Sequence, residues 1–326
     1  RKTMPKISII LPTFNVEKYI AKALESCINQ SFKDIEIIVV DDCGSDKSID
    51  IAKEYAKKDE RIKIIHNEEN LGLLRARYEG VKAAGGGYIM FLDPDDYLEL
   101  NACEECVRIL NTEKESDFIW FDFIYKRISG VINRGNFLQD QTFTIFEYCE
   151  NIIIQNKNIC YWNLCSKLIK TEIYLASFSF LEKEILNTRL IMAEDALIYF
   201  FIILNCGKIT TSAKNIYYYC ENDNSSVGTN DIVKIEKNLQ DEKMVIGILL
   251  EFLNHHKKNI ELYLYVFLKI MIGKLIVYKL HREIKLYRLK YNYMIYTMKK
   301  IKNKFIIKYF LLKRFLMEKY FKNKFN

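Results

Sequence analysis

Residues 88–96 read YIMFLDPDD, an apolar run followed directly by a turn that carries three carboxylates. The run has the length and composition of a buried β-strand. In open α/β sheets, ligands bind at the carboxyl ends of the strands, so this strand would deliver Asp93, Asp95 and Asp96 to a binding edge. Carboxylates packed this closely repel one another, and a hard divalent cation shared with phosphate oxygens relieves that repulsion. The stretch therefore predicts a nucleoside-diphosphate site in an α/β fold.

The sequence around this stretch alternates short β-branched runs with amphipathic segments up to about residue 110. Strands are expected at 7–11, 35–40, 62–65 and 88–92, and helices at 19–30, 48–57 and 73–84. Such alternation is typical of a parallel sheet with crossover helices. From about residue 145 the pattern becomes mostly helical. We therefore expect an α/β nucleotide-binding region followed by a mainly helical one.

The length of 326 residues and the apolar content of 50% exclude a disordered protein. Nine cysteines are scattered along a chain without a recognisable secretory signal, which favours free thiols over disulfides. Cys103 and Cys106 have the spacing of half a zinc site, but no matching pair follows, and Cys160 and Cys165 are spaced differently. Packed or surface thiols are therefore favoured over structural zinc.

No targeting segment or membrane-spanning helix is expected from the sequence. The most apolar later stretch, residues 262–278, is interrupted by Lys269 and Lys274. A spanning helix needs about 20 largely apolar residues.

The net charge of +7 is unevenly distributed along the chain. Residues 281–326 carry 14 Lys and Arg against Glu283 and Glu318, which gives this end +12 and leaves −5 for the first 280 residues. Basic residues interleaved with Tyr, Phe, Leu and Ile predict an amphipathic helix on anionic lipid. Nucleic acid is not expected as a partner because no base-reading motif accompanies the charge. Packing of these helices on the body of the protein or on a second subunit remains an alternative.

Three further motifs are predicted to meet the acidic turn at the same edge of the sheet. Residues 12–15 (PTFN) follow the first strand, and residues 41–42 (DD) follow the second. A carboxylate at that position can accept the imide N–H of uracil, although a single Asp after a strand can also be a helix cap. Residues 70–72 (NLG) open a helix whose first turns offer Arg75 and Arg77. Backbone N–H groups at a helix start, together with Arg, suit phosphate, whereas two Arg on a helix can also simply be solvated.

The four motifs, in this order, resemble those of the family 2 inverting glycosyltransferases of the GT-A fold. The matching stretches are SIILPTFN at 8–15, VVDDCGSD at 39–46, NLG at 70–72 and FLDPDD at 91–96. The resemblance implies an α/β GT-A domain, with a Rossmann-like nucleotide-binding sheet and crossover helices, followed by a mostly helical, basic C-terminal region. The expected divisions are a domain at 4–225, made of a nucleotide-sugar half (4–110) and an acceptor half (111–225), and a helical region at 226–326 with a membrane-associating tail.

The resemblance also implies a UDP-sugar donor and assigns roles to individual residues. Asp42 would accept the imide N–H of uracil, and Thr13 would contact the nucleoside. Asp93 would lie at the ribose or the cation, and Asp95 would be the main ligand of Mn²⁺ or Mg²⁺. Cys43 departs from the commoner small polar residue, a change that we expect to be tolerated. The other residues expected to bind the donor are Pro12, Asn15, Asn70, Gly72, Arg75 and Arg77.

Two segments of the acceptor half resemble motifs of the same family. Residues 192–197 (MAEDAL) resemble the acidic base motif, which makes Asp195 the general base and Glu194 its competitor and an acceptor contact. Without the resemblance, this pair would be read as an ordinary helix N-terminus. Residues 161–168 (YWNLCSKL) resemble the acceptor-side segment, where an exposed Trp162 would stack on a pyranose, although a large aromatic is more often core.

A narrower similarity, over residues 8–106, is to bacterial lipooligosaccharide β-1,3-galactosyltransferases that build ganglioside-like outer cores. It implies UDP-galactose as donor, a terminal N-acetylgalactosamine of a lipid-linked oligosaccharide as acceptor, and a location on the cytoplasmic face of the inner membrane. The residues of the nucleotide site do not distinguish galactose from glucose, N-acetylglucosamine or N-acetylgalactosamine. A catalytically silent UDP-sugar-binding module is the alternative from another class, and homo-oligomer formation is left open. A dinucleotide-dependent oxidoreductase is disfavoured because residues 12–15 lack G-x-G-x-x-G.

Overall fold

The computed structural model describes residues 6–113, 116–154, 161–181, 185, 188–222, 229–291 and 293–325. Cys160 and residues 1–5 lie outside these ranges. The chain divides into two compact units. The first comprises residues 1–145, 162–190 and 201–223, and the second comprises 146–161, 191–200 and 224–326.

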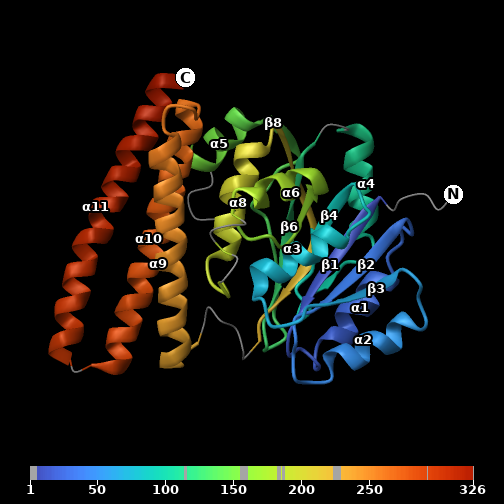
Figure 1. Cartoon of the computed structure of the whole chain (residues 1–326). Coiled ribbons are helices and arrows are strands. Elements are labelled where there is room, and N and C mark those ends of the chain that lie inside the picture. Colours follow the sequence, from blue (N-terminus) through green and yellow to red (C-terminus); the bar gives the residue numbers. More distant parts are fainter. Residues whose placement is uncertain are drawn as a thin grey trace. The chain divides into compact units, whose positions relative to one another are not determined.

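The first unit contains a ten-stranded mixed sheet (Figure 1). Eight strands follow the order β3-β2-β1-β4-β9-β6-β10-β5, while β7 pairs with β6 and β8 pairs with β10. Its strands are β1 (Ile7–Thr13), β2 (Ile35–Asp41), β3 (Ile62–His66), β4 (Tyr88–Phe91), β5 (Tyr97–Leu98), β6 (Phe118–Lys126), β7 (Ile132–Arg134), β8 (Gln141–Thr144), β9 (Lys167–Lys170) and β10 (Lys208–Cys220). Strands β3, β2, β1 and β4 are parallel. The chain moves outward from β1 to β3 and returns on the other side of β1 as β4. Strand order therefore reverses beside β1, the kind of position at which α/β sheets bind ligands.

Helices cover both faces of this sheet and bury β1 completely. The helices of the first unit are α1 (Ile20–Ile28), α2 (Ser48–Ala56), α3 (Leu73–Ala83), α4 (Ala102–Thr112) and α6 (Thr171–Ser179). Ile9 of β1 shares a core with residues of α1 and α4. Ile10 faces α3, where a Cβ built on Gly80 would lie only 2.4 Å from its Cγ2. The glycine thus lets α3 pack closely against the sheet.

The structure confirms the strands and helices expected before residue 110, with ends that differ by at most two residues. It differs from the expectation in the later part, where β10, a 13-residue strand, lies between β6 and β5. The register of β10 against β6 shifts between Ser212 and Tyr217. The polar pair Lys214 and Asn215 interrupts the apolar alternation there, which hides the strand in the sequence.

The cysteines with zinc-like spacing lie in the apolar core. Cys103 and Cys106 belong to α4 and are fully buried free thiols. Burial raises the pKa of Cys103 to about 12 and raises the pKa of Cys106 well above its usual range. Both side chains therefore act as neutral packing groups.

The second unit is helical. It includes most of α5 (Ile145–Ile154) and the long helices α9 (Ile232–His256), α10 (Leu262–Lys290) and α11 (Tyr293–Phe325), while α8 (Glu194–Asn205) crosses between the units. Helix α10 packs against both α9 and α11, so the three lie side by side (Figure 1). No helix in the described part of the chain combines the length and the apolar content needed to cross a bilayer. The expected boundary at 225/226 falls outside the described residues, and residues 146–161 and 191–200 of the expected acceptor half cluster with the C-terminal helices.

Candidate active site

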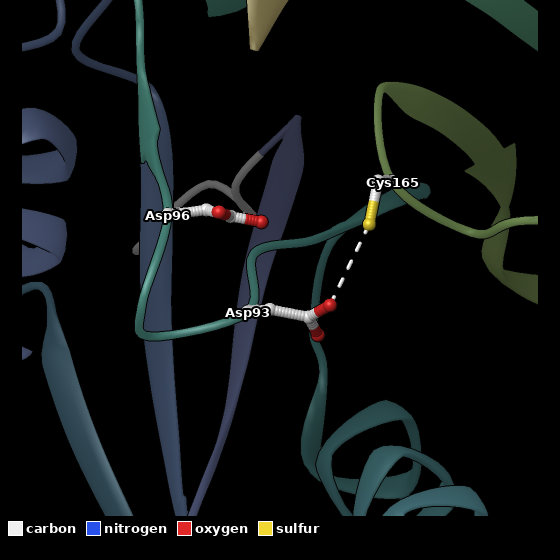
Figure 2. A group of neighbouring side chains, drawn as sticks. All are labelled: Asp93, Asp96 and Cys165. Carbon is white, nitrogen blue, oxygen red and sulfur yellow. Dashed lines mark hydrogen bonds between the residues drawn. The ribbon is translucent and has the colours of Figure 1, made fainter. Parts of the chain in front are cut away.

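The acidic turn between β4 and β5 lies at the carboxyl end of β4, as expected from the sequence. Oxygen atoms of Asp93 and Asp96 and the sulfur of Cys165 all lie within 4.8 Å of one another. Figure 2 shows the Cys165 thiol pointing toward the Asp93 carboxylate, to which it donates a hydrogen bond of 3.5 Å. Carboxylates suit Mg²⁺ and Mn²⁺, and a thiol favours softer ions. The group therefore fits a divalent cation by its chemistry.

Burial and neighbouring negative charge raise the proton affinity of Asp95 and Asp96 in this turn. Asp96 is 3% exposed, and burial, followed by the charges of Asp95 and Asp93, raises its pKa well above the usual range. Burial and the charge of Asp93 raise the pKa of Asp95 to about 6. A bound cation would stabilise the ionised forms and reverse these shifts. The turn thus has the electrostatic character of a cation site.

The late strand β10, and Asn222 two residues after it, supply partners for the turn that the sequence reasoning missed. The hydroxyl of Tyr217 donates to Asp96 at 2.7 Å and accepts the N–H of Asp93 at 3.2 Å. The N–H of Cys220 also donates to Asp96 at 2.7 Å, and the amide of Asn222 donates to Asp95 at 2.5 Å. The aromatic run YYYC at 217–220 is the signal that could have indicated a strand here.

The two arginines at the start of α3 have different surroundings. Arg77 is 1% exposed, and its guanidinium donates to Asp93 at 2.9 Å and lies 5.6 Å from the ring centroid of Phe91. The structure therefore places Arg77 beneath the acidic turn, where it orients Asp93, and not in the open position expected for a phosphate ligand. Arg75 is half-buried. Burial raises the pKa of Asp42, and the positive charge of Arg75 opposes part of that rise.

Asp42 organises the loop that precedes α3. It is 3% exposed and accepts hydrogen bonds from the N–H of Leu71 at 2.8 Å, the N–H of Gly72 at 3.1 Å and the amide of Asn67 at 2.8 Å. The amide of Asn70 donates to the Asp42 carbonyl at 3.1 Å. Burial raises the pKa of Asp42, and these hydrogen bonds oppose that rise. Asp42 is therefore first a structural acceptor for residues 67–72.

Position 72 requires glycine for two reasons. Its φ of 80° lies in the left-handed region, and an added Cβ would lie 3.0 Å from the Cα of Arg189. The loop thus packs directly on the backbone of residues 189 and 190.

The segments after β1 and β2 meet at the same edge, because Thr13 is aligned with Asp41 in the parallel pair. Pro12 and Thr13 are buried, and the Thr13 hydroxyl donates to the carbonyl of Leu11 at 3.0 Å. Asn15, with a φ of 53°, accepts the N–H of Ser45 at 2.7 Å. Asn15 therefore joins the two loops.

His66 ends β3 at this edge. Its Nδ1 lies 2.7 Å from Asp41 Oδ2.

The remaining expected site residues belong elsewhere in the chain. Glu194 and Asp195 open α8 within the second unit, where Glu194 is buried and Asp195 half-buried. Trp162 is 6% exposed, which favours the core alternative over a stacking platform.

Residues 8–159 match the sequence model of the family described as glycosyl transferase family 2. This part of the chain is a family 2 glycosyltransferase domain. The domain carries the acidic turn, the Asp42 loop and the segment after β1.

Related proteins extend this assignment. The chain is 50% identical over 95 residues to the uncharacterized glycosyltransferase EpsJ of Bacillus subtilis (strain 168), covering 29% of this chain and 27% of that protein. It is 32% identical to the poly(ribitol-phosphate) beta-glucosyltransferase of Bacillus spizizenii, covering 66% of this chain and 32% of that protein. The chain therefore spans about a third or less of these two relatives.

A solved structure shares the fold along most of the chain. The crystal structure of S. aureus TarS 1-349 in complex with UDP-GlcNAc aligns over 94% of this chain and 92% of that chain, with a TM-score of 0.55 and 20% sequence identity. The chain thus has the GT-A fold followed by a helical C-terminal region.

Proposed function

We propose that this chain is a metal-dependent inverting glycosyltransferase that uses a UDP-sugar. The observation that carries the proposal is the acidic turn at the carboxyl end of β4, inside a family 2 domain. Asp93, Asp95 and Asp96, with Cys165 beside them, would hold Mn²⁺ or Mg²⁺. When bound, the cation would neutralise negative charge on the diphosphate of the donor.

The loops after β1, β2 and β3 would bind the nucleotide. A carboxylate offers about four acceptor positions, and three at Asp42 are used by the loop, so one remains for the imide N–H of uracil. Thr13 would contact the nucleoside, and Arg75, at the N-terminus of α3, would face the phosphates. Arg77 would act indirectly, by orienting Asp93.

In the proposed reaction, the Asp195 carboxylate takes the proton of the acceptor hydroxyl while that oxygen bonds to the anomeric carbon. The bond from the anomeric carbon to the diphosphate oxygen breaks in the same step, so the configuration inverts and UDP leaves. General-base catalysis of this kind contributes typically about 10²- to 10⁴-fold in rate. Glu194, one residue earlier, would contact the acceptor.

The narrower proposal is transfer of galactose from UDP-galactose to a terminal N-acetylgalactosamine of a lipooligosaccharide outer core, in β-1,3 linkage. The similarity over residues 8–106 supports it. Transfer of N-acetylglucosamine is the second candidate, because the TarS structure with the same fold was solved with UDP-GlcNAc.

We also propose that α11 holds the protein on an anionic membrane surface, on the cytoplasmic face of the inner membrane. One face of α11 packs on α10, where Asn303 is buried and its amide donates to the Leu280 carbonyl. The roughly opposite face exposes large apolar side chains at successive turns. We call this face the outer stripe: Met294, Met298, Ile301, Phe305, Tyr309, Leu312 and Leu316.

The charges around the outer stripe support lipid over protein as the surface that it meets. Exposed lysines flank the stripe, namely Lys302, Lys304, Lys308 and Lys313. Residues 284–317 contain no Asp or Glu. A second copy of the chain docking through this face would bring like charges together, whereas anionic headgroups would attract them.

The proposed reaction is tested by transfer from a panel of UDP-sugars with Mn²⁺, to acceptors that end in N-acetylgalactosamine, galactose or glucose. Product from UDP-galactose on N-acetylgalactosamine, lost in Asp195→Asn, is the expected result. Another productive pair would retain the reaction class and discard galactose. Tight UDP binding without transfer to any acceptor would favour the silent module.

A further inference from the structure

The turn that precedes α8 is held by side chains from α9 and α10, all within the second unit. Asp241 of α9 accepts the N–H of Ile191 at 3.1 Å. The guanidinium of Arg282, from α10, lies 3.4 Å from the sulfur of Met192. These two contacts attach consecutive residues of the turn to two different helices, immediately before Glu194 and Asp195.

The groups that hold the turn are buried and charged. Asp241 and Glu242 are each 3% exposed. Arg282 donates from Nε to Glu242 at 3.2 Å, while Asp241 also pairs with Lys237. Burying an ion pair costs desolvation energy that its attraction barely offsets, so such a pair contributes little net stability. Fixing a geometry is a better physical reason for these charges than stabilising a helical bundle.

The backbone that they hold adopts an unfavourable conformation. Ala193 has a φ of 62°, in the left-handed region that a residue with a Cβ seldom adopts. Such a conformation persists only where the surroundings determine it. The carbonyl of Ala193 accepts the N–H of Leu197 at 3.0 Å, in the first turn of α8. The conformation at Ala193 therefore sets the direction in which Glu194 and Asp195 leave the turn.

We propose that Asp241 and the Glu242–Arg282 pair are positioning residues for the Glu194–Asp195 carboxylates. They act through Ile191 and Met192, and they touch neither donor nor acceptor. The inference rests on the proposed function of Asp195 as the base. It gives the C-terminal helices a role in the transfer step that is separate from membrane attachment.

The test compares kcat and KM for the donor, together with UDP affinity by calorimetry, among matched variants. Asp241→Ala removes the acceptor for the Ile191 N–H and is expected to lower kcat about tenfold or more, since a small misplacement of a reacting group is costly. Its UDP affinity should stay unchanged. Asp241→Asn retains an acceptor oxygen and should keep most of kcat.

The control breaks an exposed ion pair between the same two helices. Lys290 and Glu236 lie 2.6 Å apart on the surface of α10 and α9, so Lys290→Gln should leave kcat unchanged. Arg282→Lys provides a second test that does not depend on the folding of Asp241→Ala. It keeps a positive charge near Glu242, loses the planar group beside Met192, and should also lower kcat with unchanged UDP affinity.

An unchanged kcat in folded Asp241→Ala, or in Arg282→Lys if the first variant does not fold, overturns the proposal. So does an equal loss in Lys290→Gln. If the wild-type protein transfers no sugar at all, the proposed function fails by itself. Hydrogen exchange at the Ile191 amide then tests whether Asp241 holds the turn before α8. Faster exchange in Asp241→Ala than in Asp241→Asn supports the positioning role, and equal exchange overturns it.

Discussion

Replacing Asp42 with asparagine should loosen the loop at residues 67–72 even in the absence of nucleotide. One Asp42 oxygen accepts from Leu71 and Asn67, and the other accepts from Gly72. The asparagine oxygen can still accept hydrogen bonds from Leu71 and Asn67, but these bonds are then made to a neutral acceptor. The asparagine NH₂ group faces the N–H of Gly72, so that hydrogen bond is lost. Hydrogen bonds to charged groups contribute about 1.5–3 kcal/mol each, and neutral ones about 1 kcal/mol.

The net effect is smaller than the sum of the lost bonds. Burial raises the pKa of Asp42, which means that the folded state already disfavours its charge, and a neutral side chain recovers part of that cost. We expect Asp42→Asn to lower the free energy of unfolding by about 2 kcal/mol.

Urea unfolding, followed by circular dichroism in nucleotide-free buffer, measures this loss. Asp41→Asn is the matched control, because the Asp41 carboxylate meets the exposed ring of His66 and should contribute less than about 1 kcal/mol. Equal stability of the two variants would refute the structural role of Asp42 and leave only the uracil contact.

Three other measurements test separate parts of the structure. Gly80→Ala should cost about 1–3 kcal/mol in urea unfolding, because its Cβ would overlap the side chains of Ile10 in β1 and Val40 in β2. Gly87→Ala, with open space around it, should be neutral, and equal effects of the two variants would contradict the packing argument. Burial raises the pKa of Asp95 to about 6, so the cation-free protein should lose stability as pH rises from about 4 through 6. Below that pH, Mn²⁺ must displace a proton from Asp95, so Mn²⁺ affinity should rise with pH from about 4 through 6; a flat profile over this range in calorimetric titrations would exclude Asp95 as a ligand. Phe305→Asp, in the outer stripe, should weaken the salt-sensitive binding of the protein to anionic vesicles in sedimentation assays. Val233→Asp changes a similarly exposed apolar position on α9 and should not weaken it. Equal binding by both variants would indicate that the outer stripe packs on protein and not on lipid.

The sequence was sufficient to predict the first four strands and the acidic turn, for a physical reason. Strands β1, β2 and β4 are buried along almost their whole length and therefore appear as nearly continuous apolar runs, and the turn at 93–96 follows the last run without a gap. Strand β3 is only partly buried, but its isoleucines still favour a strand. Strand β10 could not be predicted, because its alternation breaks at 213–215 and its pairing depends on β6 and β5. The hydroxyl of Tyr217 at the centre of the site was missed for the same reason.

Side-chain direction was the other information that the sequence lacked. Two arginines near the start of a helix both indicated phosphate, but Arg77 points into the interior toward Asp93. The uracil contact of Asp42 stays a prediction, but the sequence did not indicate that Asp42 also accepts three hydrogen bonds from residues 25 to 30 positions away along the chain. Such pairings depend on how the helix and loop pack on the sheet, which periodicity does not specify.

The contacts made by β10 have a consequence for how the site forms during folding. Asp96 and its partner Tyr217 are separated by 121 residues, and Asp95 and Asn222 by 127. Contacts of such high sequence separation form late, since a long loop must close first. During synthesis, the loops after β1 and β2 therefore emerge and can fold well before the carboxylates of the acidic turn receive their partners. Completion of the acidic turn waits for residues 217–222, so a ribosome-bound N-terminal half would have the loops after β1 and β2 without a completed acidic turn.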